Sequence, residues 1–232
     1  MRVDIWSDVV CPFCYIAKHR LEAAAAQLEL ELEVHWHSFQ LNKDADLKLQ
    51  GSNIERLAQK YQRSVPEVEQ MQAEIAAMAK EVAIEFNWQQ VKPGSSFDAH
   101  RIIHLAQSKG LGNEAQAAFF YSVLTEGLAI DARETLEDVA ARIGLNPLEV
   151  DDVLDSELYA DFVKFDEDMA QDQLKVTGVP FFVFNQRIAL AGAQPTEVFV
   201  QVLEKALALP AIAEQNAEDQ ADDEQLEQQA QA

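Results

Sequence analysis

The chain has 232 residues, of which 48% are hydrophobic, so it can bury a substantial core in one large domain or two modest ones. Its formal net charge of −22 at pH 7 argues against nucleic acids and anionic membranes as partners, because both are polyanions. A charge interrupts the one early apolar run, and no run reaches roughly 18 apolar residues. We therefore expect a soluble cytoplasmic protein without a signal peptide or transmembrane helix.

The first predicted element is a strand. Residues 1–7 alternate, with Val3, Ile5 and Ser7 on one side. A helix follows, because Pro12 suits a first helical turn, and apolar residues then recur at steps of three and four as far as about residue 30. The strand and the helix therefore meet at residues 8–11.

The two cysteines of the chain, Cys11 and Cys14, lie at this junction. Unpaired N–H groups and the helix dipole favour a thiolate at Cys11, and the thiolate is the form that attacks a disulfide. We expect Cys14, one turn further in, to be more buried and to attack second. A strand that leads into C-x-x-C at a helix start is a thioredoxin-type arrangement.

Two other roles for the cysteine pair are less favourable. A zinc site normally needs four protein ligands, and the chain has no second cysteine pair. A structural disulfide across so short a ring would remove little chain entropy. We therefore expect no metal. Because cytoplasmic thiols are kept reduced, a reactive pair there indicates a reductase, isomerase or sensor rather than a bulk oxidant.

A second strand and a long helical region follow. Residues 32–41 alternate, which predicts a strand parallel to the first in a right-handed β-α-β unit. His35 and His37 share one face of this strand, where we favour a polar or packing role over a metal site. The region from residue 52 to about residue 174 is almost wholly helical in pattern. Its predicted helices are 53–61, 65–83, 97–109, 114–126, 135–143, 147–154 and 157–174.

Two features of the helical region are candidates for function. His100 and His104 are four residues apart on one helical face, a spacing that can bind metal, but the glutamate of the zinc-hydrolase motif is missing. We favour packing for both histidines. Phe119, Phe120 and Tyr121 form an aromatic cluster that we assign to the helical core rather than to a substrate surface.

Strand character returns at residues 178–184, and a turn at Asn185 and Gln186 leads into a second strand that ends at residue 191. Thr196 is predicted to cap a last amphipathic helix. The order β-α-β, helices, β-β-α is the plan of an α/β thioredoxin-like fold with a large all-α insertion.

The predicted domain boundaries follow from this plan. Residues 1–50 and 175–209 form the two halves of the thioredoxin-like domain, and residues 51–174 form the insertion. The end of the chain, 210–232, is rich in Gln, Ala and acidic residues and lacks aromatic residues, so we expect an acidic disordered tail.

Five segments carry a resemblance to a known family, and they span the chain from Arg2 to about Leu209. They are Asp8-Val9-Val10-Cys11-Pro12-Phe13-Cys14, Ala99-His100-Arg101-Ile102, Leu124-Thr125-Glu126-Gly127, Gly178-Val179-Pro180-Phe181-Phe182-Val183-Phe184 and Gly192-Ala193-Gln194-Pro195. With these segments the chain resembles the DsbA family of thioredoxin-fold oxidoreductases, specifically its cytoplasmic FrnE-like branch.

The resemblance implies a protein dithiol-disulfide oxidoreductase that acts by thiol-disulfide exchange. Cys11 would attack a substrate disulfide and Cys14 would resolve the mixed disulfide. Pro180 would be a cis proline beside the pair, so that the backbone of Val179 binds an extended substrate strand. The alternative is a proline that merely starts an edge strand. This activity requires Cys11 to lie near Val179–Pro180 and to be open to solvent.

Three further residues are implied to tune the site. Pro12 and Phe13 would set the balance between the oxidised and reduced forms. Periplasmic relatives have histidine where Phe13 stands, so the resemblance implies a less stabilised Cys11 thiolate and a less oxidising pair. Asp8 is either the proton acceptor for Cys14 or a surface turn residue.

The expected partners follow from this chemistry. No cofactor is expected beyond the redox-active cysteine pair. The substrate would be a protein or small molecule that carries a disulfide or thiol, with glutathione as a candidate co-substrate and with glutathione or a thioredoxin system for recycling.

Two alternative functions stay open. One is a glutathione-dependent isomerase or transferase of the kappa and 2-hydroxychromene-2-carboxylate isomerase type, whose members usually have serine in place of Cys11. The other is a non-enzymatic peptide-binding or chaperone module.

Overall fold

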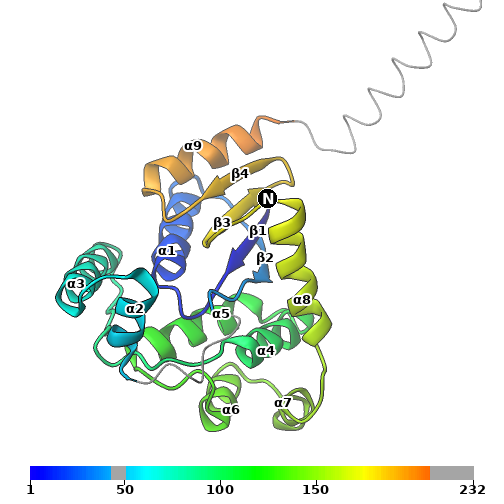
Figure 1. Cartoon of the computed structure of the whole chain (residues 1–232). Coiled ribbons are helices and arrows are strands. Elements are labelled where there is room, and N and C mark those ends of the chain that lie inside the picture. Colours follow the sequence, from blue (N-terminus) through cyan, green and yellow to red (C-terminus); the bar gives the residue numbers. More distant parts are fainter. Residues whose placement is uncertain (43–50, 210–232) are drawn as a thin grey trace, which may run out of the picture.

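The computed structural model describes residues 1–42 and 51–209, and its centre is a four-stranded mixed sheet (Figure 1). The strand order is β2-β1-β3-β4; β1 pairs in parallel with β2, whereas β3 is antiparallel to both of its neighbours. The strands are β1 (Arg2–Ser7), β2 (Glu33–Ser38), β3 (Phe181–Phe184) and β4 (Ile188–Ala191). As predicted, the sheet joins two strands from each end of the chain.

Apolar residues cover both faces of this sheet. Ile5 and Phe182 belong to the main core, together with residues of α1 (Pro12–Gln27) and α9 (Thr196–Leu207). On the other face, Trp6 packs with Phe39, Ala170 and Val176 in a separate buried cluster. This division follows from strand geometry, since successive side chains point to opposite faces. The sheet therefore lies between two helical layers.

Helices occupy the chain between β2 and β3, as the sequence predicts. They are α2 (Asn53–Tyr61), α3 (Val65–Glu81), α4 (Phe97–Ser108), α5 (Gly112–Phe120), α6 (Arg133–Arg142), α7 (Pro147–Leu154) and α8 (Ala160–Asp168). Two π-helical segments, η1 (Tyr121–Thr125) and η2 (Met169–Gln173), continue α5 and α8. Figure 1 shows α4 to α7 gathered at one end of the sheet, with α8 running beside it.

The helices α2, α3, α4 and α7 begin at the predicted residues, whereas α5 and α6 begin two residues earlier and α8 three residues later than predicted. Ser52 caps α2 in a reciprocal capping box with Glu55, and Asn146 caps α7 through the Leu148 N–H. The prediction that Thr196 caps α9 is wrong. Thr196 is already the first helical residue, and Pro195, with an extended backbone, occupies the capping position without a side-chain hydrogen bond.

The aromatic cluster of the helical region is only partly core. Phe119 and Phe120 are fully buried, as predicted, but Tyr121 is 48% exposed. The main apolar core is continuous from Ile5 of the sheet to Ile102 of α4, so the helical region shares its interior with the sheet. The domain boundaries at residues 50 and 175 stay a prediction.

The predicted acidic tail, 210–232, lies outside the described residues. Among the helices of residues 1–42 and 51–209, none combines the length and the apolar content that crossing a membrane requires.

Candidate active site

The cysteine pair lies at the start of α1, where the sequence places it. Cys11 is the N-cap residue with an extended backbone, Pro12 begins the helix, and the Cys14 N–H donates to the Cys11 carbonyl at 3.1 Å. Both cysteines are free thiols. Cys14 is 2% exposed and Cys11 is 3% exposed, so Cys14 is the more buried of the two by a small margin, and the expectation that Cys11 is open to solvent is wrong. Phe13 between them is 38% exposed.

Cys11 lies beside the Val179–Pro180 peptide bond, which is cis. Its thiol donates to the Val179 carbonyl, with Sγ 3.7 Å from the oxygen, across 168 residues of sequence. The sheet explains the meeting, because Trp6 at the end of β1 pairs with Phe181 at the start of β3. The chain leaves β1 toward Cys11 and enters β3 from Pro180, so both reach the same end of the sheet.

Polar groups of Asp8 and Ser7 face the Cys14 thiol, and sequence reasoning named Asp8 but missed Ser7. Burial raises the pKa of this thiol well above its ordinary value, and contact with Cys11 raises it further. The backbone N–H of Asp8 and the hydroxyl of Ser7 oppose this rise. Gln116 on α5 donates from Nε2 to Ser7 Oγ at 3.2 Å, and both residues are buried. No local pattern points to Gln116, because it lies 109 residues from Ser7.

Asp8 is completely buried, so the alternative that it is a surface turn residue is wrong. Its Oδ2 accepts from the Leu41 N–H at 2.7 Å and its Oδ1 accepts from the Val10 N–H at 3.3 Å. Its backbone carbonyl accepts from the Cys11 N–H at 3.0 Å. Asp8 therefore holds the loop before α1 against the segment that follows β2. Its backbone N–H is the group that faces Cys14.

One aromatic side chain of α2 also belongs to this region. Burial raises the pKa of Tyr61, and the nearby Cys11 raises it further. Tyr61 is exposed and lies near Cys11 in space, and Phe13 is exposed and lies two residues after Cys11 in the sequence. Apolar and aromatic surface therefore borders the cysteine pair.

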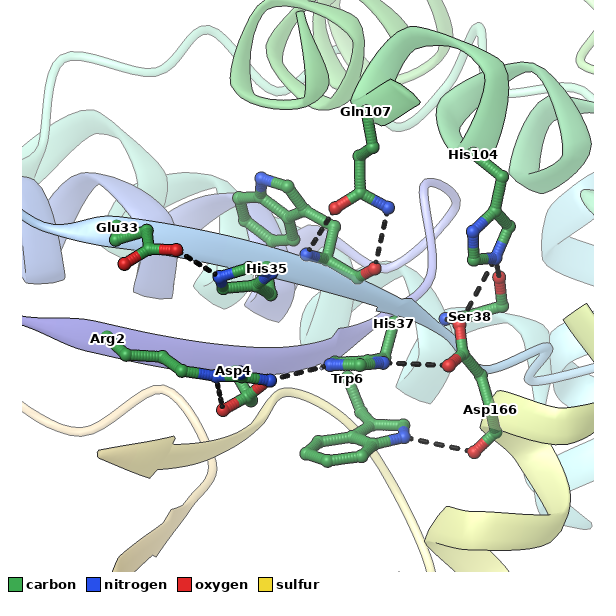
Figure 2. A network of polar contacts seen from close by, with 11 residues as sticks. Arg2, Asp4, Trp6, Glu33, His35, His37, Ser38, His104, Gln107 and Asp166 are labelled. Carbon is green, nitrogen blue, oxygen red and sulfur yellow. Dashed lines mark hydrogen bonds and ion pairs between the residues drawn. The ribbon is translucent and has the colours of Figure 1, made fainter. Parts of the chain in front are cut away.

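A second polar cluster joins the sheet to α8 (Figure 2). His37 of β2 lies between two carboxylates, with Nδ1 2.7 Å from Asp166 Oδ1 and Nε2 3.0 Å from Asp4 Oδ1. The indole of Trp6 stacks on His37 with ring centroids 4.3 Å apart and donates from Nε1 to the Asp166 carbonyl. Arg2 binds the same Asp4 carboxylate. The cluster thereby fixes α8 to the sheet.

Electrostatics bind this cluster together. Burial by itself would lower the pKa of His37, but hydrogen bonds and charge attraction from Asp166 and Asp4 raise it to about 9. Burial would raise the pKa of Asp166, but His104 and His37 lower it to about 2. Burial would also raise the pKa of Asp4, but His37 and Arg2 hold that pKa far below its ordinary range. An imidazolium between two carboxylates is the consequence.

Two further histidines of the sequence analysis, His35 and His104, have hydrogen-bond partners within the protein. His35 contacts Glu33 at 2.9 Å, and His104 Nε2 lies 3.2 Å from Asp166 Oδ2 and 3.1 Å from Ser38 Oγ. His37 and His104 therefore take the polar packing roles that we favoured, although their acidic partner comes from a distant helix. In the part of the chain that the structure describes, no three His, Cys, Asp or Glu side chains are grouped to hold a metal ion.

Comparison with known proteins gives consistent matches across most of the chain. Residues 2–204 match the family model described as a DSBA-like thioredoxin domain. The crystal structure of the probable DsbA oxidoreductase SCO1869 from Streptomyces coelicolor is 34% identical in sequence and has a TM-score of 0.82, covering 91% of this chain and 92% of its own. These matches confirm the predicted thioredoxin-like fold.

Two further solved structures share this fold at lower identity. A 2-hydroxychromene-2-carboxylate isomerase is 21% identical with a TM-score of 0.65, and the similarity covers 94% of this chain and 98% of that one. The cytosolic disulfide reductase DsbM from Pseudomonas aeruginosa with GSH is 20% identical with a TM-score of 0.61, covering 90% of this chain and 100% of its own. At these identities the likeness is one of fold.

Proposed function

This chain belongs to the family of DSBA-like thioredoxin-domain proteins, and from that premise we propose that it is a protein dithiol-disulfide oxidoreductase whose reactive pair is Cys11 and Cys14. The observation that carries the proposal is the approach of the Cys11 sulfur to the Val179 carbonyl at 3.7 Å. It puts a thiol at a helix start beside a backbone group that an extended substrate can use.

The first step is attack on the substrate. The N-terminal end of α1 favours negative charge at Cys11, which supports a thiolate there. The thiolate attacks one sulfur of a substrate disulfide. A bond forms between Cys11 and that sulfur, the substrate S–S bond breaks, and the second substrate sulfur leaves as a thiolate.

The second step is resolution by Cys14. Its thiol loses a proton and its sulfur attacks the Cys11 sulfur, which forms the Cys11–Cys14 disulfide and releases the first substrate sulfur as a thiolate. The substrate gains two electrons and the pair loses two. In reverse, the oxidised pair passes its disulfide to a substrate dithiol. Asp8 is the proposed aid to proton loss from Cys14.

The surroundings of the pair suit a polypeptide substrate. Extended peptides bind by main-chain hydrogen bonds, and the Val179 carbonyl beside Pro180 is an acceptor at the right place. Phe13 and Tyr61 provide exposed aromatic surface nearby. Because Cys11 is 3% exposed, a substrate reaches its sulfur only after the groups that cover it shift.

Glutathione is the proposed small-thiol partner for recycling, and a thioredoxin system is the other. The solved structure of a disulfide reductase with GSH on a similar fold supports glutathione. That relative is cytosolic, which supports a reducing compartment for this chain as well. In such a compartment the pair would act as a reductase or isomerase.

The isomerase-type alternative shares the fold but differs in chemistry. A glutathione-dependent isomerase needs no resolving thiol, whereas this chain has one, buried next to Cys11. The peptide-binding alternative needs neither cysteine. The presence of both thiols at one helix start therefore favours dithiol exchange.

A trapping experiment tests the proposal. We expect Cys14→Ser to accumulate mixed disulfides between Cys11 and proteins, because the resolving thiol is gone. The matched control Cys11→Ser should trap nothing. Glutathione as the sole adduct, with isomerase activity intact in Cys14→Ser, would instead support the alternative enzyme. Binding of unfolded chains that survives replacement of both cysteines would support the chaperone role.

A further inference from the structure

The imidazole of His100 on α4 is buried and has a ring nitrogen without a hydrogen-bond partner. Among the fully buried side-chain nitrogens and oxygens of residues 1–42 and 51–209, its Nε2 is the one without a hydrogen-bond partner. The residue is 2% exposed, so water does not readily satisfy it. Leaving a buried polar atom unpaired is destabilising, and such groups in native structures call for an explanation, of which a catalytic or redox role is one.

The unpaired nitrogen faces Asp8. Nε2 lies 3.6 Å from Asp8 Oδ1, just beyond hydrogen-bond distance, and both side chains are almost fully inaccessible. The Asp8 carboxylate is held in place by the N–H groups of Leu41 and Val10. A shift of a few tenths of an ångström in the imidazole therefore completes a hydrogen bond to a fixed carboxylate.

Asp8 in turn contacts both cysteines through its backbone. Its carbonyl accepts from the Cys11 N–H, and its N–H faces the Cys14 sulfur. These contacts link the buried imidazole of His100 to the buried carboxylate of Asp8 and, through the Asp8 backbone, to the loop that carries the reactive pair. In a low-dielectric interior a change of charge on one of these groups acts strongly on the others.

We propose that His100 is a positioning residue for the exchange reaction, which shares a proton with Asp8 and lets that pair accept the proton of Cys14 when Cys14 attacks the mixed disulfide. This inference rests on the proposed function. The Cys14 S–H bond breaks and its proton passes to the Asp8–His100 pair, while the Cys14–Cys11 bond forms. The bond from Cys11 to the substrate breaks, the substrate leaves as a thiolate, and the proton then returns to solvent or to that thiolate.

The need for such an acceptor comes from Cys14 itself. Burial disfavours its thiolate, so the resolving step is slow unless a nearby group takes the proton. Histidine is suited to this exchange, because its imidazole can give or take a proton near neutral pH.

Other charged groups around His100 are engaged elsewhere. Arg101, next on α4, points to Asp98 and to backbone carbonyls at residues 153, 156 and 158. His104, one turn further along, contacts Asp166 of α8. The packed helix α5 contributes the uncharged Gln116, which bonds to Ser7. The charged side chain in contact with His100 is Asp8.

The test separates the two chemical steps with an aromatic disulfide, 5,5′-dithiobis(2-nitrobenzoate), as the probe. Reduced protein releases one thionitrobenzoate when Cys11 attacks and a second when Cys14 resolves the adduct. We expect His100→Phe to slow the second release about 100-fold, the lower end of the range for loss of acid-base assistance, while the first release changes less than about twofold. His104→Phe, on the same helix one turn away, is the matched control and should leave the second release unchanged.

Two further readouts distinguish a proton-transfer role from a packing role. In the wild type and in His104→Phe, the rate of the second release should change with pH in a step that is missing in His100→Phe. The double variant Asp8→Asn with His100→Phe should be no slower than the slower single variant, because the two groups act as one unit. His100→Gln should show the same selective slowing and keeps the test available if the phenylalanine variant does not fold.

A second release as fast in His100→Phe as in the wild type, with an unchanged pH profile, would overturn the role of His100. Equal slowing of the first and second releases in this variant would overturn it as well. A wild-type protein that shows no second release would refute dithiol exchange itself, which keeps the two failures apart.

Discussion

The side-chain amide of Gln107 pairs with the backbone of Trp36 as a neighbouring strand would. The Trp36 N–H donates to Gln107 Oε1 at 2.8 Å, and Gln107 Nε2 donates to the Trp36 carbonyl at 2.9 Å (Figure 2). β2 is the edge of the sheet, and an edge strand with free backbone groups is a site of unwanted pairing. Gln107 on α4 therefore occupies two backbone groups of this edge strand that could otherwise pair with another strand.

Replacing Gln107 tests how much these two hydrogen bonds contribute to stability. We expect Gln107→Leu to lower the free energy of unfolding by about 1–3 kcal/mol, since it leaves two buried or half-buried backbone groups unpaired. Urea unfolding measures the change. Gln70→Leu is the control, because Gln70 bonds to Glu74 of its own helix at the surface, and its replacement should change stability by less than about 0.5 kcal/mol. Equal changes in the free energy of unfolding in the two variants would show that the hydrogen bonds of Gln107 to Trp36 contribute little to stability.

The His37 cluster predicts a loss of stability in alkali. The folded-state pKa of about 9 lies above the ordinary value of 6.5, so the stabilisation is fully present below about pH 6.5 and is lost as the pH rises through 9. We expect the midpoint of urea unfolding to fall over this range in the wild type. His37→Gln should be less stable at pH 6 and should lack this fall. A parallel decline in both proteins would contradict the assignment.

The acidic partners predict the opposite dependence. The pKa of Asp166 is lowered to about 2, so its stabilisation is present above the ordinary value of 3.8 and disappears as the pH falls toward 2. Asp166→Asn should destabilise the protein strongly at pH 7 and much less at pH 2. Asp161→Asn, on the same helix but exposed, serves as the comparison and should change little at either pH.

The hydroxyl of Ser7 should lower the pKa of Cys14. Because this group opposes the effect of burial, we expect Ser7→Ala to raise the pKa of the Cys14 thiol further. Titration of the Cys14 Cβ resonance by NMR in the reduced protein measures it directly. Gln116→Leu should act in the same direction but more weakly, since Gln116 only orients Ser7. An unchanged titration in Ser7→Ala would exclude the contact.

Phe13 should keep the cysteine pair reducing. An uncharged ring without a donor cannot stabilise a neighbouring thiolate, whereas a histidinium can. We expect Phe13→His to stabilise the reduced form and so make the pair more oxidising, and Phe13→Leu to leave the equilibrium close to that of the wild type. Equilibration with defined ratios of reduced and oxidised glutathione measures both.

The local parts of the fold were accessible from sequence. The alternation of residues 1–7 and the proline at the first turn of α1 each act over a few residues, and each is present in the structure. The meeting of Cys11 with Val179 followed only from family likeness, since 168 residues separate them. No local rule would have brought them together.

Other features lay beyond local patterns for the same reason. The two carboxylates of the His37 cluster come from β1 and α8, and Asp166 lies 129 residues from His37 in sequence. The burial of Cys11 depends on what packs over a helix start, which the helix signal itself does not encode. The wide turns at η1 and η2 share the apolar spacing of the helices they extend, so periodicity did not distinguish them.

The low exposure of Cys11 also bears on the durability of the protein. Progressive oxidation of cysteine to sulfinic and sulfonic acids depends on thiolate character and on access. A sulfur that is 3% exposed meets dissolved peroxide far less often than one at the surface. The same enclosure that limits access to Cys11 thus shields its sulfur from irreversible oxidation.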